Sequence, residues 1–226
     1  NDGGAQITER GVCWSTSHSP TISDSRSIDT YPSMGNYTCG LTNLLPGTQY
    51  YVRAYAINSE GTAYGNEVSF TTDSYSVPTV TTNSVFDITT TSAKGGGYVT
   101  DNGNSSLTET GICWSTSHNP TTYNSNNHTS YPIMGSYTLN MTGLIPGSQY
   151  YVRAYATNSE GTAYGEEVSF ITHSPPTVTT NSVTNITPNS ATCGGNVTAE
   201  GSGAVTARGV CWSTNPNPTT SDSHTN

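Results

Sequence analysis

Residues 144–158 read LIPGSQYYVRAYATN, a Pro-Gly turn followed by a run in which small apolar residues alternate with Tyr and Arg. Successive side chains of a β-strand point to opposite faces, so this period of two predicts a strand over 149–158. One of its faces is expected to meet a core and the other to meet solvent. The core set is Val152, Ala154 and Ala156, and the solvent set is Tyr151, Arg153 and Tyr155.

The same stretch also occurs at residues 44–58, because the chain is built from repeats. Residues 11–72 return as 111–172 without a gap, and Pro78–Val85 returns as Pro176–Val183. The repeat unit is therefore about 98–100 residues long. We expect an incomplete repeat at 1–74 that lacks its opening strands, a complete repeat at 75–173, and an incomplete repeat at 174–226 that lacks its closing strands. We interpret the chain as a window on a longer tandem array.

Within the complete repeat, short segments of alternating polarity are separated by turn residues, and none shows the period of a helix. The fold class expected is all-β, a sandwich of two sheets. A polar stretch at 116–135 is expected to be a loop. The predicted strands are 79–85, 92–100, 107–115, 136–144, 149–158 and 164–172, with turns at 101–104, 146–147 and 160–161.

Several motifs carry a family resemblance. The Leu-x-Pro-Gly-x-x-Tyr corner and the strand after it resemble fibronectin type III domains, and Gly-Val-Cys-Trp-Ser-Thr, Gly-Thr-Ala-Tyr-Gly and Glu-Val-Ser-Phe are similar to fibronectin-type-III-like repeats in surface and secreted proteins of Gram-negative bacteria. The resemblance covers essentially the whole chain. It implies tandem fibronectin III/immunoglobulin-like β-sandwich repeats in an extracellular or cell-surface protein, where such domains serve as spacers, adhesins and stalks.

Composition excludes several functions. The net charge is −9 with only six basic residues, so a nucleic-acid binder is excluded, since that needs clustered Lys and Arg. No apolar run is long enough for a transmembrane helix. The five histidines lack zinc-ligand spacing, His18 and His118 are expected to be solvated, and no nucleophile elbow or phosphate loop occurs. We therefore expect no enzyme activity, no metal and no cofactor.

The cysteines and tryptophans leave two alternatives open. Cys39 and Cys193 each occur in one repeat only, on strands expected in the sheet opposite Cys13 and Cys211. Disulfides Cys13–Cys39 and Cys193–Cys211 would staple the sheets, each contributing about 2–4 kcal/mol; the alternative is five buried thiols. With the disulfides, the tryptophans point outward; without them, Trp114 belongs in the core. The exposed aromatic ladder predicted by the first alternative is Trp14, Trp114, Trp212, Tyr51, Tyr55, Tyr151 and Tyr155.

Glycan attachment is the chemistry with the most candidate residues. Asn-x-Ser/Thr triplets mark N-linked acceptors, and the family resemblance implies O-glycans on Asp-Ser/Thr motifs. Chance alone produces several such triplets in a chain this rich in Asn, Ser and Thr. The candidates are Asn36, Asn104, Asn127, Asn140, Asn185 and Asn196, with Ser25, Thr30 and Ser223 for O-linked sugars.

The function expected is that of an extracellular structural protein, a tandem-repeat stalk or fibril coated with glycans, whose partners are neighbouring repeats or copies of itself. The alternative is an adhesin or a carbohydrate-binding accessory module of a secreted protein, with the aromatic ladder as its sugar-binding surface. A third alternative concerns assembly, since the opening strands of the last repeat can complete the first repeat of another chain by strand addition. The repeated Cys-Trp strand fits that idea poorly, and the mass of the native chain distinguishes it from a continuous array.

Overall fold

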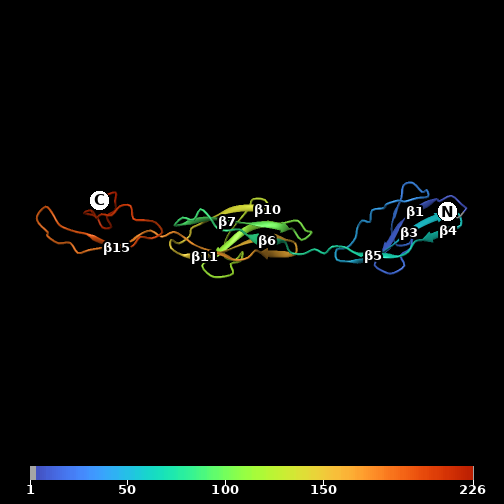
Figure 1. The fold of residues 1–226 in the computed structure, drawn as a ribbon, viewed down its shortest axis with the longest axis horizontal. Helices are drawn as coiled ribbons and strands as arrows, with labels where there is room; N and C mark the ends of the chain where they lie inside the picture. The colour runs from blue at the N-terminus through green and yellow to red at the C-terminus, as the bar shows by residue number, and fades with distance from the viewer. Residues whose placement is uncertain (1–3, 226) are drawn as a thin grey trace. The chain divides into compact units, whose positions relative to one another are not determined.

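The computed structural model describes residues 4–225, and every regular element in them is an antiparallel β-strand (Figure 1). The all-β prediction is confirmed. The chain divides into two compact units: unit 1 runs to Ser76 and includes Gly103–Ser105, and unit 2 holds the remainder to the end of the chain. The boundary after Ser76 lies close to the predicted repeat boundary at residue 74. The predicted repeat boundary at residue 173 falls inside unit 2.

The complete repeat, residues 75–173, is a sandwich of two sheets. The smaller sheet has the strand order β10-β7-β6, and in the larger sheet β8 and β11 are central, with β9 beside β8 and with β12 and β13 both beside β11. The strands of the smaller sheet are β6 (Thr79–Thr82), β7 (Ser92–Asp101) and β10 (Gly135–Thr142). Those of the larger sheet are β8 (Glu109–Ser115), β9 (Ser125–His128), β11 (Gln149–Asn158), β12 (Gly161–Tyr164) and β13 (Val168–Ile171).

The core lies between these sheets and contains the residues that the alternation in β11 predicted to be buried. Val152, Ala154 and Ala156 have no exposed surface. Trp114, one of the tryptophans assigned to the ladder, packs with them and is 7% exposed. The hydroxyl of Tyr137 in β10 lies 2.8 Å from the carbonyl oxygen of Gly111, so this buried polar group links the two sheets and is satisfied.

Two segments differ from the predicted strands. The polar stretch 116–135 contains β9, whose alternation is hidden because nearly all its residues are polar. The predicted strand 164–172 is two strands, β12 and β13, that pair with different parts of β11. Between them Gly165 approaches β6 so closely that a Cβ there would lie 2.6 Å from the main-chain nitrogen of Thr82, and the chain leaves the ladder at this point.

Unit 1 repeats the larger sheet alone. Its described residues contain no second sheet, and the segment 36–42, which corresponds to β10, has no strand pairing because nothing corresponding to β7 lies beside it. A strand needs a neighbour to satisfy its main-chain groups. The strands of unit 1 are β1 (Glu9–Ser15), β2 (Ser25–Ile28), β3 (Gln49–Asn58), β4 (Gly61–Tyr64) and β5 (Val68–Thr71).

The closing segment, residues 174–225, forms two small hairpins. The first, β14 (Thr177–Thr180) with β15 (Gly195–Ala199), corresponds to β6 and β7. The second, β16 (Cys211–Trp212) with β17 (Ser223–His224), corresponds to the end of β8 and the start of β9. Val178 in β14 is 62% exposed, whereas its counterpart Val80 in the complete repeat is 7% exposed. The β14–β15 hairpin therefore has the same apolar residue that is buried in the complete repeat, but no second sheet packs against it in the closing segment.

Candidate functional site

The outer face of the larger sheet, which points away from the core, carries the same side-chain cluster in unit 1 and in the complete repeat. We call it the outer cluster. It joins β8, β11, the end of β12 and the connection between β12 and β13 to the loop that follows β8. Its members in the complete repeat are Cys113, His118, Tyr151, Arg153, Tyr155, Tyr164 and Glu167, and each has an identical counterpart 100 residues earlier.

Glu167 holds the loop through both carboxylate oxygens. Nδ1 of His118 lies 2.7 Å from one oxygen, and the main-chain N–H of Asn119 donates to the other. The His118 ring also packs on Tyr151, with 3.8 Å between ring centroids. The Asn119 N–H, with the His118 hydrogen bond, holds the pKa of the Glu167 carboxyl below its usual range. Although the His118 side chain is 66% exposed, as expected for a loop residue, it is paired and stacked.

Arg153 and Tyr164 form the second attachment. The Arg153 Nε–H donates to the carbonyl oxygen of Gly165 at 2.9 Å, and its guanidinium lies 4.8 Å from the Tyr164 ring centroid, a cation–π contact. The Tyr164 hydroxyl accepts a hydrogen bond from the main-chain N–H of Thr122 at 3.2 Å. The arginine is thus occupied within the repeat, and the loop is fixed at both ends.

Tyr155 and Cys113 lie beneath this layer. Tyr155 is fully buried and donates its hydroxyl hydrogen to Glu109, and burial together with that carboxylate raises its pKa. Cys113 is fully buried as well, and burial raises the pKa of its thiol to about 11. A thiol with that pKa is neutral at physiological pH, so Cys113 lacks the thiolate that a nucleophile or metal ligand needs.

The predicted aromatic ladder is wrong for most of its members. Trp14 and Trp114 lie on the inner face of their sheets and are 6% and 7% exposed, because they share that face with the apolar residues of the neighbouring strand. Tyr55 and Tyr155 do lie on the outer face, but they are buried there, and the Tyr155 ring lies beside Gly111 and Tyr164 of the neighbouring strands. Tyr51 and Tyr151 are half-buried under histidine rings, at centroid distances of 3.9 and 3.8 Å. Trp212 is 53% exposed.

The predicted disulfides are also wrong, since all five cysteines are free. The reason is strand parity. Cys13 and Cys211 lie on the outer face, where their thiols contact the carbonyl oxygens of Pro20 and Pro218. Cys39 and Cys193 occupy positions that face the core in the complete repeat. The members of each predicted pair therefore point to opposite faces of the sandwich, and their Cβ vectors diverge.

The predicted glycan acceptors stay predictions. Five of the six asparagines are exposed, and Asn127 is half-buried with its side-chain amide donating to the Asn140 carbonyl at 3.0 Å. The Asn104 amide donates to the Ser74 carbonyl at 3.1 Å. The other exposed candidates are Asn36, Asn140, Asn185, Asn196, Ser25, Thr30 and Ser223.

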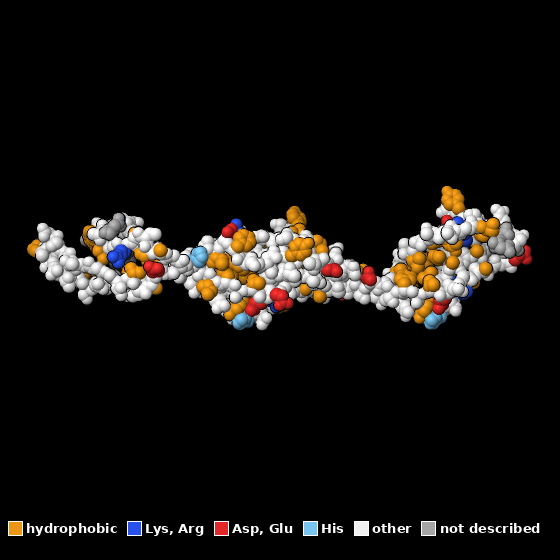
Figure 2. Space-filling model, in the orientation of Figure 1, with side chains coloured by type: hydrophobic (Ala, Val, Ile, Leu, Met, Phe, Trp, Pro, Cys, Tyr) orange, Lys and Arg blue, Asp and Glu red, His pale blue; other side chains and the backbone are white. Residues whose placement is uncertain are grey.

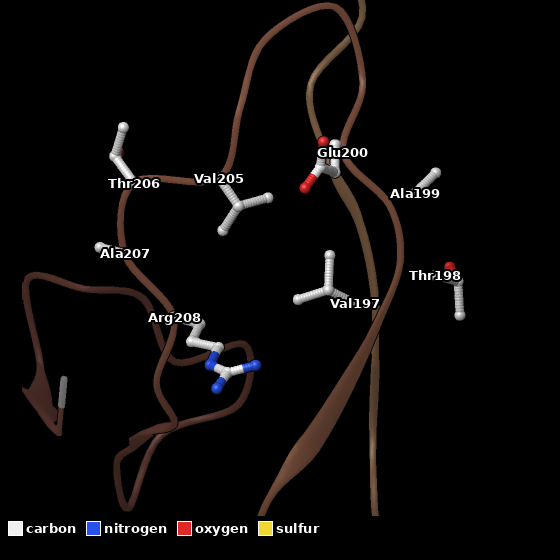
Figure 3. Close-up of a pocket in the computed structure, with 8 residues that line it drawn as sticks. All are labelled: Val197, Thr198, Ala199, Glu200, Val205, Thr206, Ala207 and Arg208. Atoms are coloured by element: carbon white, nitrogen blue, oxygen red, sulfur yellow. The ribbon is translucent and has the colours of Figure 1, made fainter.

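A hollow of about 820 Å³ lies in the closing segment, between the end of β15 and residues 205–208 (Figure 3). Val197 and Val205 border it, and they correspond to Val99 and Leu107, which belong to the packed interior of the complete repeat. The hollow therefore corresponds to part of the interior of the complete repeat, and in the closing segment no second sheet fills it. Residues 4–225 hold no cluster of three or more His, Cys, Asp or Glu side chains suited to a metal ion.

One buried pair escaped the sequence reasoning. Arg10 is 7% exposed and forms an ion pair with Asp29, with 2.5 Å between Nη2 and Oδ2. At the same places in the complete repeat, the Thr110 and Thr129 hydroxyls lie 2.8 Å apart. The sequence offers no clear signal for this pair, because both positions differ between the repeats along with many others, including most of residues 22–30.

Among the comparisons with known proteins, only the one with solved structures finds similar proteins. No protein-family model and no curated protein matches the chain. The FN1-FN3 domains of chicken CNTN1 align with 22% identity over 75% of this chain and 57% of that chain, at a TM-score of 0.34. Domains A168-A170 from titin align with 16% identity over 74% of this chain and 59% of that chain, also at 0.34. The chain therefore spans less than two thirds of either, and the sandwich architecture rests on the sheets described above. Among the described residues, no helix is long and apolar enough to cross a membrane.

Proposed function

We propose that this chain is part of an extracellular structural protein whose tandem sandwiches form a stalk or fibril that carries glycans. The observation that supports this most is the outer cluster. Its histidine, arginine, tyrosine and carboxylate side chains recur in two repeats, yet they bind the repeat's own loop and leave little to offer a ligand. A sequence that repeats the same internal attachments in successive copies is typical of a spacer.

Two further features support the proposal. The surface is poor in charge, with 9% charged residues, and rich in hydroxyl and amide groups that sugars can be attached to. In addition, the complete repeat has its own core, as a module in a linear array requires. The alternative of carbohydrate binding loses its basis, because it required outward-pointing tryptophans, and Trp14 and Trp114 are buried.

Immunogold electron microscopy of intact source cells tests this role. An antibody raised against residues 75–173 should label filaments outside the cell, and an antibody against a cytoplasmic protein should label nothing until the cells are opened. Mass spectrometry of the extracted protein should show sugar increments on peptides that contain the acceptors named above. Gold label that is seen only in opened cells contradicts the extracellular role. A measured mass equal to that of the polypeptide without sugars contradicts the glycan coat.

A further inference from the structure

We propose that each repeat carries a contact point for a second copy of this chain, the exposed Tyr-Pro-x-Met segment between β9 and β10. We call residues 131–134 of the complete repeat, and residues 31–34 of unit 1, the tip. The inference rests on the proposed function for its setting and deepens it, because it names the lateral neighbour of one stalk as another stalk of the same kind.

The tip of the complete repeat places apolar side chains in solvent. Tyr131 is 80% exposed, Met134 49% and Ile133 38%, and Pro132 is exposed as well. The complete repeat has both of its sheets, so this exposure does not come from a missing part of the sandwich. Hydrophobic side chains stand out from the visible face of the complete repeat, and most of the surface around them is neither acidic nor basic (Figure 2). Contiguous exposed apolar patches are typical of binding surfaces.

The two repeats share the tip although the segment before it differs. Between 22–30 and 122–130 a single residue is unchanged, whereas Tyr-Pro-x-Met returns at the same places. Tyr31 is 77% exposed, close to the value in the complete repeat. Tyr123 gives the contrast, because it is 99% exposed and its place in unit 1 is taken by Ser23. An exposed aromatic residue that both repeats retain indicates a contact outside the repeat.

Two threonine hydroxyls fix the backbone of the tip in the complete repeat. The Thr129 hydroxyl donates to the carbonyl oxygen of Tyr131 at 2.7 Å, and the main-chain N–H of Ile133 donates to the Thr110 hydroxyl oxygen at 3.4 Å. The two hydroxyl oxygens lie 2.8 Å apart, and Thr110 has no exposed surface. Pro132 restricts the segment further, because its ring fixes φ. The apolar side chains are therefore presented on a held backbone.

Unit 1 holds the same segment by different chemistry. The guanidinium of Arg10, at the place of Thr110, donates to the carbonyl oxygens of Ser33 and Gly35. Gly35 and Gly135 both have positive φ, 110° and 86°, which suits glycine where the chain leaves the tip. Two unlike anchors thus give one result, a fixed and exposed tip. A fixed tip loses little conformational entropy when it binds, so it is suited to a contact.

The absence of charge around the tip favours a second copy as the partner. The chain has a net charge of −9, so two copies repel each other in most orientations. In the complete repeat no Asp, Glu, Lys or Arg occurs from Thr110 to Val152, a stretch that includes β9, the tip and β10. Copies that meet tip to tip therefore avoid like-charge repulsion. Because every copy presents the same tip, the contact pairs a surface with itself.

The size of the tip sets the strength of one contact. An aromatic side chain buries about 150–250 Å², so the four residues of a tip offer roughly 300–400 Å² and two tips together roughly 600–800 Å². A stable interface of standard size buries about 1,200–2,000 Å². One pair of tips is therefore a weak contact. Stalks that present one tip per repeat gain strength from several such contacts along their length.

Sedimentation equilibrium of the 226-residue chain, from micromolar to millimolar concentration, tests the contact. The chain should associate reversibly above its mass of 23.8 kDa. Tyr31→Ser combined with Tyr131→Ser should weaken the association by about tenfold or more, as removal of a central aromatic residue does in other interfaces. Tyr131→Ser alone should have a smaller effect. Tyr123→Ser is the matched control and should associate like the unaltered chain.

A second pair of substitutions separates the contact from any effect on folding. Met34→Gln with Met134→Gln removes apolar surface from the tip without changing the tyrosines, and it should weaken the association as well. Equal association of both tip variants and the unaltered chain overturns the proposal, and so does a single 23.8 kDa species at every concentration. Binding to phosphatidylcholine vesicles or to cellulose that the tip variants lose, without self-association, overturns it and assigns the tip to that surface.

Photo-oxidative coupling of tyrosines locates the contact. With a ruthenium photosensitiser, persulfate takes one electron from each of two neighbouring tyrosines and becomes sulfate, and the two rings lose their protons and join by a carbon–carbon bond. Mass spectrometry of the dimer band should show chains joined at Tyr31 or Tyr131. Joining at Tyr123 as often as at the tip overturns the proposal. Because these experiments use purified chain, their failure is separate from a failure of surface labelling on cells.

Discussion

Glu167 accepts hydrogen bonds on both oxygens, so the attachment of the loop depends on its charge. A carboxyl with a lower pKa in the folded state than in the unfolded state stabilises the fold above its unfolded value, near 4.5. That contribution is lost as the pH falls through the lower folded value. Its counterpart Glu67 is held by Ser19 and His18 in the same way.

We therefore expect the loop at 116–124 to loosen below pH 4.5, before the sheets unfold. Amide hydrogen exchange, corrected for the intrinsic effect of pH, should become several-fold faster in the loop between pH 7 and pH 3 and change little in β11. Glu167→Gln should show the fast exchange at both pH values, because an amide keeps one acceptor oxygen and carries no charge. Equal protection of the loop at pH 7 and pH 3 in the unaltered chain contradicts this role of Glu167.

The pair Arg10–Asp29 and its replacement by Thr110–Thr129 predict a coupled effect. Thr110→Arg alone places a charge at a fully buried position without a partner and should destabilise the complete repeat by about 3 kcal/mol. Adding Thr129→Asp should recover a large part of that loss. Urea unfolding of the single and double variants gives the coupling free energy, and additive effects would show that the two positions do not interact.

β7 contains three consecutive glycines, and at Gly97 close packing leaves no room for a side chain. A Cβ there would lie 2.5 Å from the Cβ of Ala154 and 2.8 Å from the Tyr137 hydroxyl. Gly97→Val should force the sheets apart and cost about 2–3 kcal/mol, the usual range for overpacking. Tyr98→Val, on the exposed side of the same strand, is the matched control. Thermal unfolding of residues 75–173 measures both, and equal melting temperatures contradict the close contact.

The strands were predictable where one face is apolar, as in β11, and they were missed where both faces are polar, as in β9. Burial on the outer face was not predictable, because Tyr155 is held there by the Glu109 carboxylate and packs beside Gly111 and Tyr164, contacts that alternation along β11 does not reveal. The orientation of Cys113 and Trp114 was ambiguous for the same reason. Alternation separates the two faces of a strand but does not say which face a loop will cover.

The complete repeat holds every member of its core cluster between Val80 and Phe170. We therefore expect residues 75–173, expressed alone, to fold and to unfold in one cooperative transition. Trp114, its single tryptophan, is buried, so its fluorescence should shift to the red in the same urea range in which the circular dichroism of the sheets is lost. Separate transitions by the two probes would mean that the repeat needs its neighbours.

The positions of the basic residues have a consequence for survival among digestive enzymes. Proteases of the trypsin type cut after Lys or Arg and require an extended, accessible backbone. In the complete repeat these residues are Lys94 in β7 and Arg153 in β11, both inside strands, and Arg10, Arg26 and Arg53 of unit 1 also lie in strands. The loops of unit 1 and of the complete repeat therefore contain no such cleavage point, whereas Arg208 in the closing segment is exposed and lies outside any strand, so enzymes of this class should cut there first.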